Sequence, residues 1–291
     1  MRRLGRVTAA LLALLLLAGS VGSAPAKPSR GVRLQAARSS TGRVVVLAYH
    51  SIADLKHDPI LHRYSVPPRR FAEQLDLLAR QGWTFVDLDA VLAAMREERQ
   101  LPPRALLLTF DDAYEDLLSD VCPILEPRGI PAVCFAVSDR IGGSNEWDNR
   151  NGATKLALLD GDGLLAVAVR GIEVGAHTAT HRPLPRVPSE ELDREVVGAA
   201  NRIEAIGLPR PRAFSYPYGH WDERVASTIR GAGYEAAFTV DWGVVQAGID
   251  PHSLPRLAVH ADDSPRRLHL KVATAHWRWA LRAVRGRSRR A

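Results

Sequence analysis

Two adjacent carboxylates at the end of an apolar stretch are the first residues that suggest chemistry. The segment ALLLTFDDAY, residues 105–114, carries Asp111 and Asp112 directly after residues typical of a buried strand. Like charges this close repel each other, and their burial costs desolvation energy. Folding gains nothing from such a pair, so we expect a neighbouring group that makes the two acids useful.

Two histidines four residues apart could be that group. His177 and His181, in the segment HTATH, could meet one divalent cation from a single helical turn. The spacing alone is a weak signal, because many such pairs are surface or core histidines. A third ligand is needed, and Asp112 is the candidate. Asp111 would then be free to take a proton from a water molecule beside the cation.

The elements that must position these residues alternate between strand and helix. Expected strands cover 43–50, 84–88, 104–110, 132–137, 171–177, 213–218, 236–240 and 256–260. Expected helices cover 67–82, 89–99, about 115–126, about 154–169, 189–207 and about 222–231. Such alternation predicts an α/β fold of parallel strands with right-handed crossovers. About eight strands in one domain suit a complete or incomplete barrel.

Catalytic groups of α/β barrels lie where the strands end at their carboxyl edge. Residues capable of chemistry follow most of the expected strands in this sequence. They are His50, Asp111 and Asp112, His177 and His181, Tyr216 to Gly219, Asp241 and Trp242, and His260. The pattern therefore predicts one site at one edge of the sheet.

The two ends of the chain account for its positive charge. The formal net charge is +7, but arginines of the two ends supply more than this excess, and the body between them is close to neutral. They are Arg2, Arg3 and Arg6 at the start, and Arg278, Arg282, Arg285, Arg287, Arg289 and Arg290 at the end. A near-neutral body argues against nucleic acid as a partner. The basic, aromatic end could contact an anionic envelope surface or form a solubilising tail.

Residues 1–26 have the pattern of a secretory signal peptide, with a basic start, an apolar middle and small residues after it. An uncleaved membrane anchor is the alternative. Residues 27–42 read as a polar linker, and we expect an exported protein of the periplasm, cell envelope or extracellular space. Cys122 and Cys134 could pair in such a compartment, although two buried thiols are the simpler expectation.

Three motifs occur in a fixed order: TFDD (109–112), HTATH (177–181) and RAFSYPYG (212–219). Residues 43–262 thereby resemble the polysaccharide deacetylases of carbohydrate esterase family four, the NodB homology domain, with residues 263–291 left as a C-terminal helix and basic tail. The resemblance implies a distorted (β/α) barrel of about seven to eight parallel strands. It makes Asp111 the catalytic base. Asp112, His177 and His181 become ligands of one divalent metal, zinc first, with nickel, cobalt or iron as alternatives.

The same resemblance assigns further roles around the base. Arg212 would orient Asp111, and the Tyr218 N–H would hold the oxyanion. Asp241 would support the arginine, and Trp242 would wall the acetyl pocket. The remaining expected pocket residues are Tyr216, Pro217 and His260. The pair Trp147-Asp148, in a long loop, could line a sugar groove or anchor the loop.

The general acid has two candidates. The late segment LAVH ends at His260, while the early segment VVVLAYHSI carries His50 and resembles the branch that deacetylates poly-β-1,6-N-acetylglucosamine. We favour His50, which implies a permuted arrangement of the barrel.

The function that follows is removal of N-acetyl groups from an exopolysaccharide or envelope glycan by a monomer. O-deacetylation of xylan or another ester is a second interpretation, and a non-catalytic glycan-binding module is a third.

Overall fold

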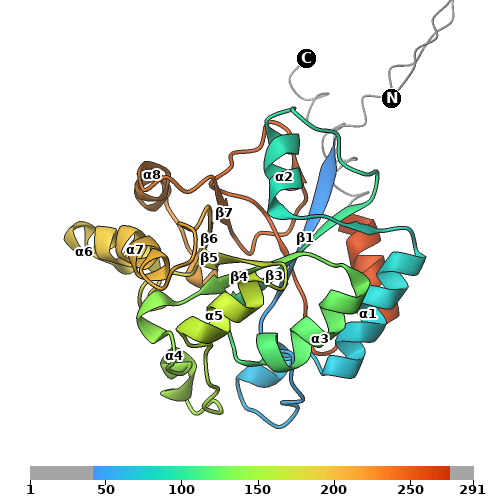
Figure 1. The fold of residues 1–291 in the computed structure, drawn as a ribbon, viewed down its shortest axis with the longest axis horizontal. Coiled ribbons are helices and arrows are strands. Elements are labelled where there is room, and N and C mark those ends of the chain that lie inside the picture. The colour runs from blue at the N-terminus through green and yellow to red at the C-terminus, as the bar shows by residue number, and fades with distance from the viewer. Residues whose placement is uncertain (1–41, 276–291) are drawn as a thin grey trace, which may run out of the picture. The chain divides into compact units, whose positions relative to one another are not determined.

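A curved sheet of nine strands runs through the middle of the described residues, 42–275 of the computed structural model (Figure 1). The strand order is β7-β6-β5-β4-β3-β1-β8, with β2 on β3 and β9 on β1. The strands are β1 Arg43–Tyr49, β2 Thr84–Phe85, β3 Ala105–Asp112, β4 Ala132–Ala136, β5 Ile172–Ala176, β6 Ala213–Ser215, β7 Ala236–Phe238, β8 Val245–Gln246 and β9 Leu257–Ala258. All of these pairings are parallel except that of β1 with β8.

Helices surround the strands in an outer ring (Figure 1). They are α1 Pro68–Arg80, α2 Leu88–Met95, α3 Cys122–Leu125, α4 Glu146–Asn149, α5 Gly161–Ala168, α6 Ser189–Asp193, α7 Ala199–Glu204 and α8 Glu223–Gly231, followed by a last helix at 265–275. Two expected helices contain a π-helical turn, at Leu117–Val121 before α3 and at Arg194–Gly198 between α6 and α7. The expected helix at about 154–169 is shorter, because Asp160 caps it and the residues before it form a loop.

Both faces of the central strands are buried, which explains their nearly continuous apolar sequence. Successive side chains of a strand point to opposite faces. In β3, Leu106, Leu108 and Phe110 belong to the larger core under the outer helices. Ala105 and Leu107 belong to the second core, which includes residues of α2. Asp111 continues the face of Ala105 and Leu107.

The segment 251–260 closes the curled sheet by bridging its two sides. The Leu254 N–H donates to the Ala237 carbonyl at 2.8 Å, which joins the segment to β7. A few residues later Leu257 and Ala258 pair with Leu47 and Ala48 of β1. The predicted barrel is therefore present as a half-barrel of short strands, completed by irregular chain.

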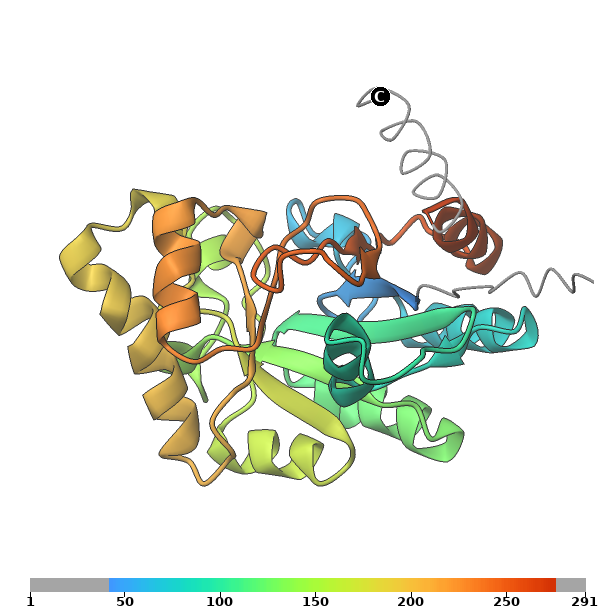
Figure 2. The ribbon, with the colours of Figure 1, turned by 90° about the horizontal axis from the view of Figure 1, so that it is seen from above.

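The last described helix, 265–275, lies beside α1 (Figures 1 and 2). Its residues Leu268, Val272 and Ala275 belong to the larger core. The packed body therefore continues past residue 262, where the sequence reading ended the catalytic domain.

The predicted signal peptide and linker, except for residue 42, lie outside the described residues, as does the basic tail from residue 276 onward. Among residues 42–275, no helix is long and apolar enough to cross a membrane. Cys122 and Cys134 are buried and unpaired, in agreement with the expectation of two buried thiols.

Candidate active site

A cleft of about 490 Å³ opens at the carboxyl ends of the strands, a volume typical of small-molecule sites. Histidines, acids and aromatic side chains dominate its lining. The lining residues are His50, Ser51, Ile60, Leu61, Tyr64, Ser65, Asp111, Asp112, Tyr114, Trp147, Asp148, His177, His181, Tyr218, Val240, Ala258 and His260. The predicted edge of the sheet therefore does carry the site.

Left-handed backbone lets Asp111 and Asp112 serve the same cleft. Neighbouring residues of a regular strand point to opposite faces, which would separate the two carboxylates. The φ angles of Asp112 and Ala113 are 75° and 56°, so the chain turns sharply where β3 ends. Thr178, His181 and Tyr218 also have positive φ, at 67°, 64° and 60°. Such conformations cost free energy in residues other than glycine, and they gather at this site.

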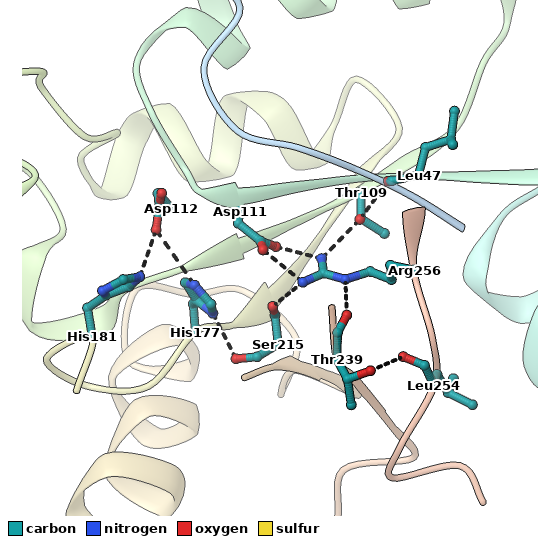
Figure 3. Close-up of polar contacts among 10 residues, drawn as sticks. All are labelled: Leu47, Thr109, Asp111, Asp112, His177, His181, Ser215, Thr239, Leu254 and Arg256. Atoms are coloured by element: carbon teal, nitrogen blue, oxygen red, sulfur yellow. Dashed lines mark hydrogen bonds and ion pairs between the residues drawn. The ribbon is translucent and has the colours of Figure 1, made fainter. Parts of the chain in front are cut away.

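Asp112, His177 and His181 form the group that could hold a cation. All three are buried, and their ligand atoms lie within 4.8 Å of one another. Asp112 Oδ1 lies 3.6 Å from His177 Nε2 and 3.3 Å from His181 Nε2 (Figure 3). The His177 Nδ1–H donates to the Ser215 carbonyl at 2.7 Å, so its Nε2 presents a lone pair to the shared space.

The donor chemistry of this group fits a divalent cation such as zinc. Asp112 Oδ1 is buried and has no aligned hydrogen-bond partner among the described residues, as expected of an oxygen that awaits a ligand. Burial lowers the pKa of His177 to about 4, so its imidazole is neutral and able to coordinate. Burial alone would raise the pKa of Asp112, but the interaction with His181 outweighs burial and lowers this pKa, so the carboxyl is ionised.

Arg256, and not Arg212, orients Asp111. Its guanidinium donates to both carboxylate oxygens of Asp111, at 2.7 and 2.8 Å (Figure 3). The other three N–H groups donate to Ser215 Oγ, Thr109 Oγ1 and the Thr239 carbonyl, at 2.9, 3.1 and 2.9 Å. All five donors are satisfied although the side chain is 0% exposed. Burial alone would raise the pKa of Asp111, but the charge and the hydrogen bonds of Arg256 reverse this and hold that pKa well below its usual range.

The prediction for Arg212 is wrong because this residue lies at the other end of its strand. Arg212 directly precedes β6, so it stands at the amino edge of the sheet. There its side chain, 37% exposed, pairs with Glu173 at 2.9 Å and with Asp89 at 2.6 Å. It forms a surface ion-pair cluster and does not contact Asp111.

The predicted supporting role of Asp241 is also corrected. Asp241 is exposed, and it contacts Arg256 through the backbone: the Arg256 backbone N–H donates to the Asp241 carbonyl at 3.0 Å. Trp242 is 39% exposed and lies outside the cleft lining formed by the described residues. The neighbouring Val240 does line the cleft.

Of the turn SYPYG, only Tyr218 reaches the cleft. Tyr216 is fully buried in the larger core, and its hydroxyl donates to the His252 carbonyl at 2.7 Å. Pro217 is buried beside it, so both expected pocket residues are structural. Gly219 allows the turn to approach Val240, because a methyl group there would lie 2.3 Å from Val240 Cγ2.

His50 and His260 both line the cleft, with Tyr64 between them. The ring of Tyr64 is 5.1 Å from that of His50 and 5.9 Å from that of His260, measured between centroids. Burial lowers the pKa of His260, and the charges of Lys271 and Arg63 lower it further. The charge of a protonated His50 would lower the pKa values of both Asp111 and Asp112.

Three side chains of the cleft received no role in the sequence analysis or only an open one. Trp147, on α4, stacks on the ring of His181 with centroids 4.2 Å apart and planes 19° apart, so it is part of the site. Asp148 also lines the cleft, and burial together with the charge of Asp112 raises its pKa. The buried hydroxyl of Tyr114 faces the same two acids and has no aligned hydrogen bond in the described chain.

Fold and site together define a class: a (β/α) half-barrel protein in which the Asp111–Arg256 pair and the Asp112–His177–His181 group meet at the carboxyl edge of the sheet. Residues 98–237 match the family model described as polysaccharide deacetylase. The poly-β-1,6-N-acetyl-D-glucosamine N-deacetylase of Staphylococcus epidermidis is 24% identical over 237 residues, covering 75% of this chain and 79% of that protein. This chain carries a polysaccharide deacetylase domain, which confirms both the resemblance and the prediction of a deacetylase hydrolase.

Solved structures show the same fold. IcaB from Ammonifex degensii superposes with a TM-score of 0.69 at 23% identity, covering 79% of this chain and 97% of that one. The Streptococcus pyogenes deacetylase PplD, in complex with acetate, gives a TM-score of 0.68 at 20% identity, covering 79% and 98%. The predicted NodB-like barrel is thereby confirmed.

Proposed function

We propose that this protein is a metal-dependent hydrolase that removes N-acetyl groups from a poly-N-acetylglucosamine-like glycan and releases acetate. The observation that carries the proposal is the pairing of two devices in one cleft. A carboxylate base, Asp111, is held by a fully bonded buried arginine, and a three-residue cation group stands beside it. A glycan-binding module would have no use for a buried ion pair of this kind.

Asp112, His177 and His181 would hold the cation, which when bound would polarise the acetyl carbonyl and make a water molecule more acidic. Asp111 accepts a proton from the attacking water at a carboxylate oxygen. Arg256 keeps that carboxylate ionised and fixes its orientation. The Tyr218 N–H is the proposed donor to the developing oxyanion, set by the left-handed turn at that residue.

His50 is the proposed general acid. The acid must be protonated when the amine leaves, and the environment of His260 lowers its pKa and disfavours that state. His50 lies at the carboxyl end of β1 and lines the same cleft as Asp111 and Asp112. His50 therefore donates the proton to the leaving nitrogen, while His260 lines the substrate cleft.

Two observations favour an N-acetylated substrate. The Staphylococcus epidermidis relative is an N-deacetylase of poly-β-1,6-N-acetyl-D-glucosamine, and the Tyr49-His50 pair stands at the end of β1. Removal of O-acetyl groups remains the second candidate, because the same base could serve an ester. The signal-like start of the sequence supports action in the periplasm, the cell envelope or outside the cell.

Acetate release from a panel of acetylated glycans tests the proposal. Purified protein should release acetate from poly-β-1,6-N-acetylglucosamine and lose this activity with a chelator, and added zinc should restore it. Asp112→Ala and His181→Ala should abolish both metal content and activity. Unchanged deacetylation by metal-free protein would contradict the mechanism, and faster release from acetyl xylan would favour the esterase.

A further inference from the structure

Asp116, at the start of the helical segment after β3, is a mostly buried acid that the proposed mechanism does not use. Its Oδ2 accepts the Ser51 hydroxyl at 2.6 Å and the Ile52 N–H at 2.9 Å. Its Oδ1 is buried and has no hydrogen-bond partner among the described residues. Burial raises the pKa of this carboxyl to about 7, against the effect of its two hydrogen bonds. The position is therefore a costly one for an acid.

The segment that Asp116 holds begins directly after His50. Ser51 and Ile52 are 2% and 0% exposed, and the Ser51 carbonyl accepts the Val66 N–H at 3.0 Å. The pairing of β1 with β3 ends one residue before His50, at Tyr49 and Phe110. Beyond that point, Asp116 and Val66 take over from the strand pairing in fixing the backbone.

The side chain of His50 has little else to orient it. Its Nδ1 is buried and without a hydrogen-bond partner in the described part of the chain, and its ring packs against Tyr64. A histidine usually acts from a defined position because a second group bonds its other ring nitrogen. Here the orientation must come mainly from the backbone.

We propose that Asp116 is a positioning residue for His50, fixing the chain after β1 so that the imidazole reaches the leaving nitrogen. This inference rests on the proposed function, in which His50 is the general acid. Asp116 stands four residues after Asp112 on the same chain segment, so one stretch of sequence sets the base, a cation ligand and the acid together. Misplacement of a catalytic group by about 1 Å can cost about 10²-fold in rate.

Asp116→Ala should lower amide hydrolysis by about 10- to 100-fold. Hydrolysis of nitrophenyl acetate should fall much less, because that leaving group needs no proton, and metal content should not change. Asp116→Asn should restore most of the amide activity, since its amide oxygen can accept both hydrogen bonds. Asp160→Ala is the control, because that carboxylate also accepts a backbone N–H, from Gly163 at 2.8 Å, but caps α5 outside the cleft.

A double-mutant cycle with His50→Ala separates positioning from general damage. If Asp116 acts through His50, Asp116→Ala should cost nothing further once the imidazole is gone. Equal losses in both backgrounds, or equal losses on amide and ester, would overturn the inference. A His50→Ala variant with full amide activity would overturn it as well.

Hydrogen exchange of the Ile52 amide gives a readout that does not depend on activity. Asp116→Ala should speed this exchange by about 10-fold or more, whereas Asp160→Ala should not. Wild-type protein that releases no acetate from any glycan would refute the proposed function. If the Ile52 amide exchanges as slowly in Asp116→Ala as in the wild type, Asp116 does not fix the backbone after His50, and the inference is refuted.

Discussion

Replacement of Arg256 should be the most informative perturbation of this site. Arg256→Met removes five hydrogen bonds, two of them to the Asp111 carboxylate, and leaves that acid buried without its counter-charge. Breaking a buried ion pair from one side typically costs about 3–5 kcal/mol. Most domains have only about 5–15 kcal/mol of stability in total. Arg256→Lys keeps the charge but has three donors and no fork, so its cost should be roughly half as large.

The pH dependence of activity should move with the same change. Asp111 must be ionised to act as base, and Arg256 is the main charge that keeps its pKa low against burial. Without the guanidinium the pKa of Asp111 rises, so the acidic limb of kcat/KM should shift to higher pH. Arg256→Lys should shift it less. Acetate release measured from pH 4 to 9 on folded, metal-loaded variants checks the shift.

Arg212→Met is the matched control, because its ion pairs are at the surface. Exposed pairs contribute about 0–1 kcal/mol, and the side chain of Arg212 is 37% exposed. Urea unfolding should show a small loss for Arg212→Met and a large one for Arg256→Met. An Arg256→Met protein with wild-type stability and an unmoved acidic limb would refute this reading of the site.

Three further outcomes are expected. His50→Ala should reduce amide hydrolysis by about 10²–10⁴-fold but should have little effect on the hydrolysis of nitrophenyl acetate. His260→Ala should have a smaller effect on both substrates. A larger loss of amide hydrolysis in His260→Ala than in His50→Ala would assign the general acid to His260. The pKa of Asp116 is about 7 in the folded protein, above its value of 3.8 in the unfolded chain, so the folded protein binds the proton more tightly. The stability that this proton contributes is fully present below about pH 4 and is lost as the pH rises through 7. The free energy of unfolding of Asp116→Asn, measured with urea, should therefore rise by about 2–4 kcal/mol relative to that of the wild type between pH 4 and pH 8. A difference between the two proteins that does not change with pH would contradict this. Gly219→Ala should cost about 2–3 kcal/mol, since its methyl group would lie 2.3 Å from a valine; Gly233→Ala, with nothing within 4 Å, should cost about 1 kcal/mol.

The strands and most helices could be predicted because their signals are local. Apolar runs such as RVVVLAY and ALLLTF give buried strands, and the spacing in PRRFAEQLDLLAR gives α1. The antiparallel strand β8 was missed because a strand of two residues is too short to show an alternation of apolar and polar side chains. The π-helical turns were missed because nothing in the sequence distinguishes them from α-helix.

The candidate site was predictable where neighbouring residues carry the signal. Residue type and spacing alone predict Asp111, Asp112, His177 and His181 as site residues. The Arg256–Asp111 pair is 145 residues apart in the chain, so its partners cannot be matched locally. One clue was available: Arg256 lies between apolar residues in an expected strand, and a buried arginine requires an acid. The position of Arg212 before its strand was a second clue, since it places that residue at the opposite edge.

The closing segment 251–260 is the part of the site that is synthesised last. A growing chain contains Asp111 well before Arg256 is added, and at about 5–20 residues per second the delay for 145 residues is roughly 7–30 s. During that time all three cation-binding side chains have been made, but the base has no counter-charge. Pairing of β9 with β1 ends the delay and delivers the guanidinium in the same event. The Asp111 carboxylate therefore gains its counter-charge only when the segment 251–260 closes the sheet.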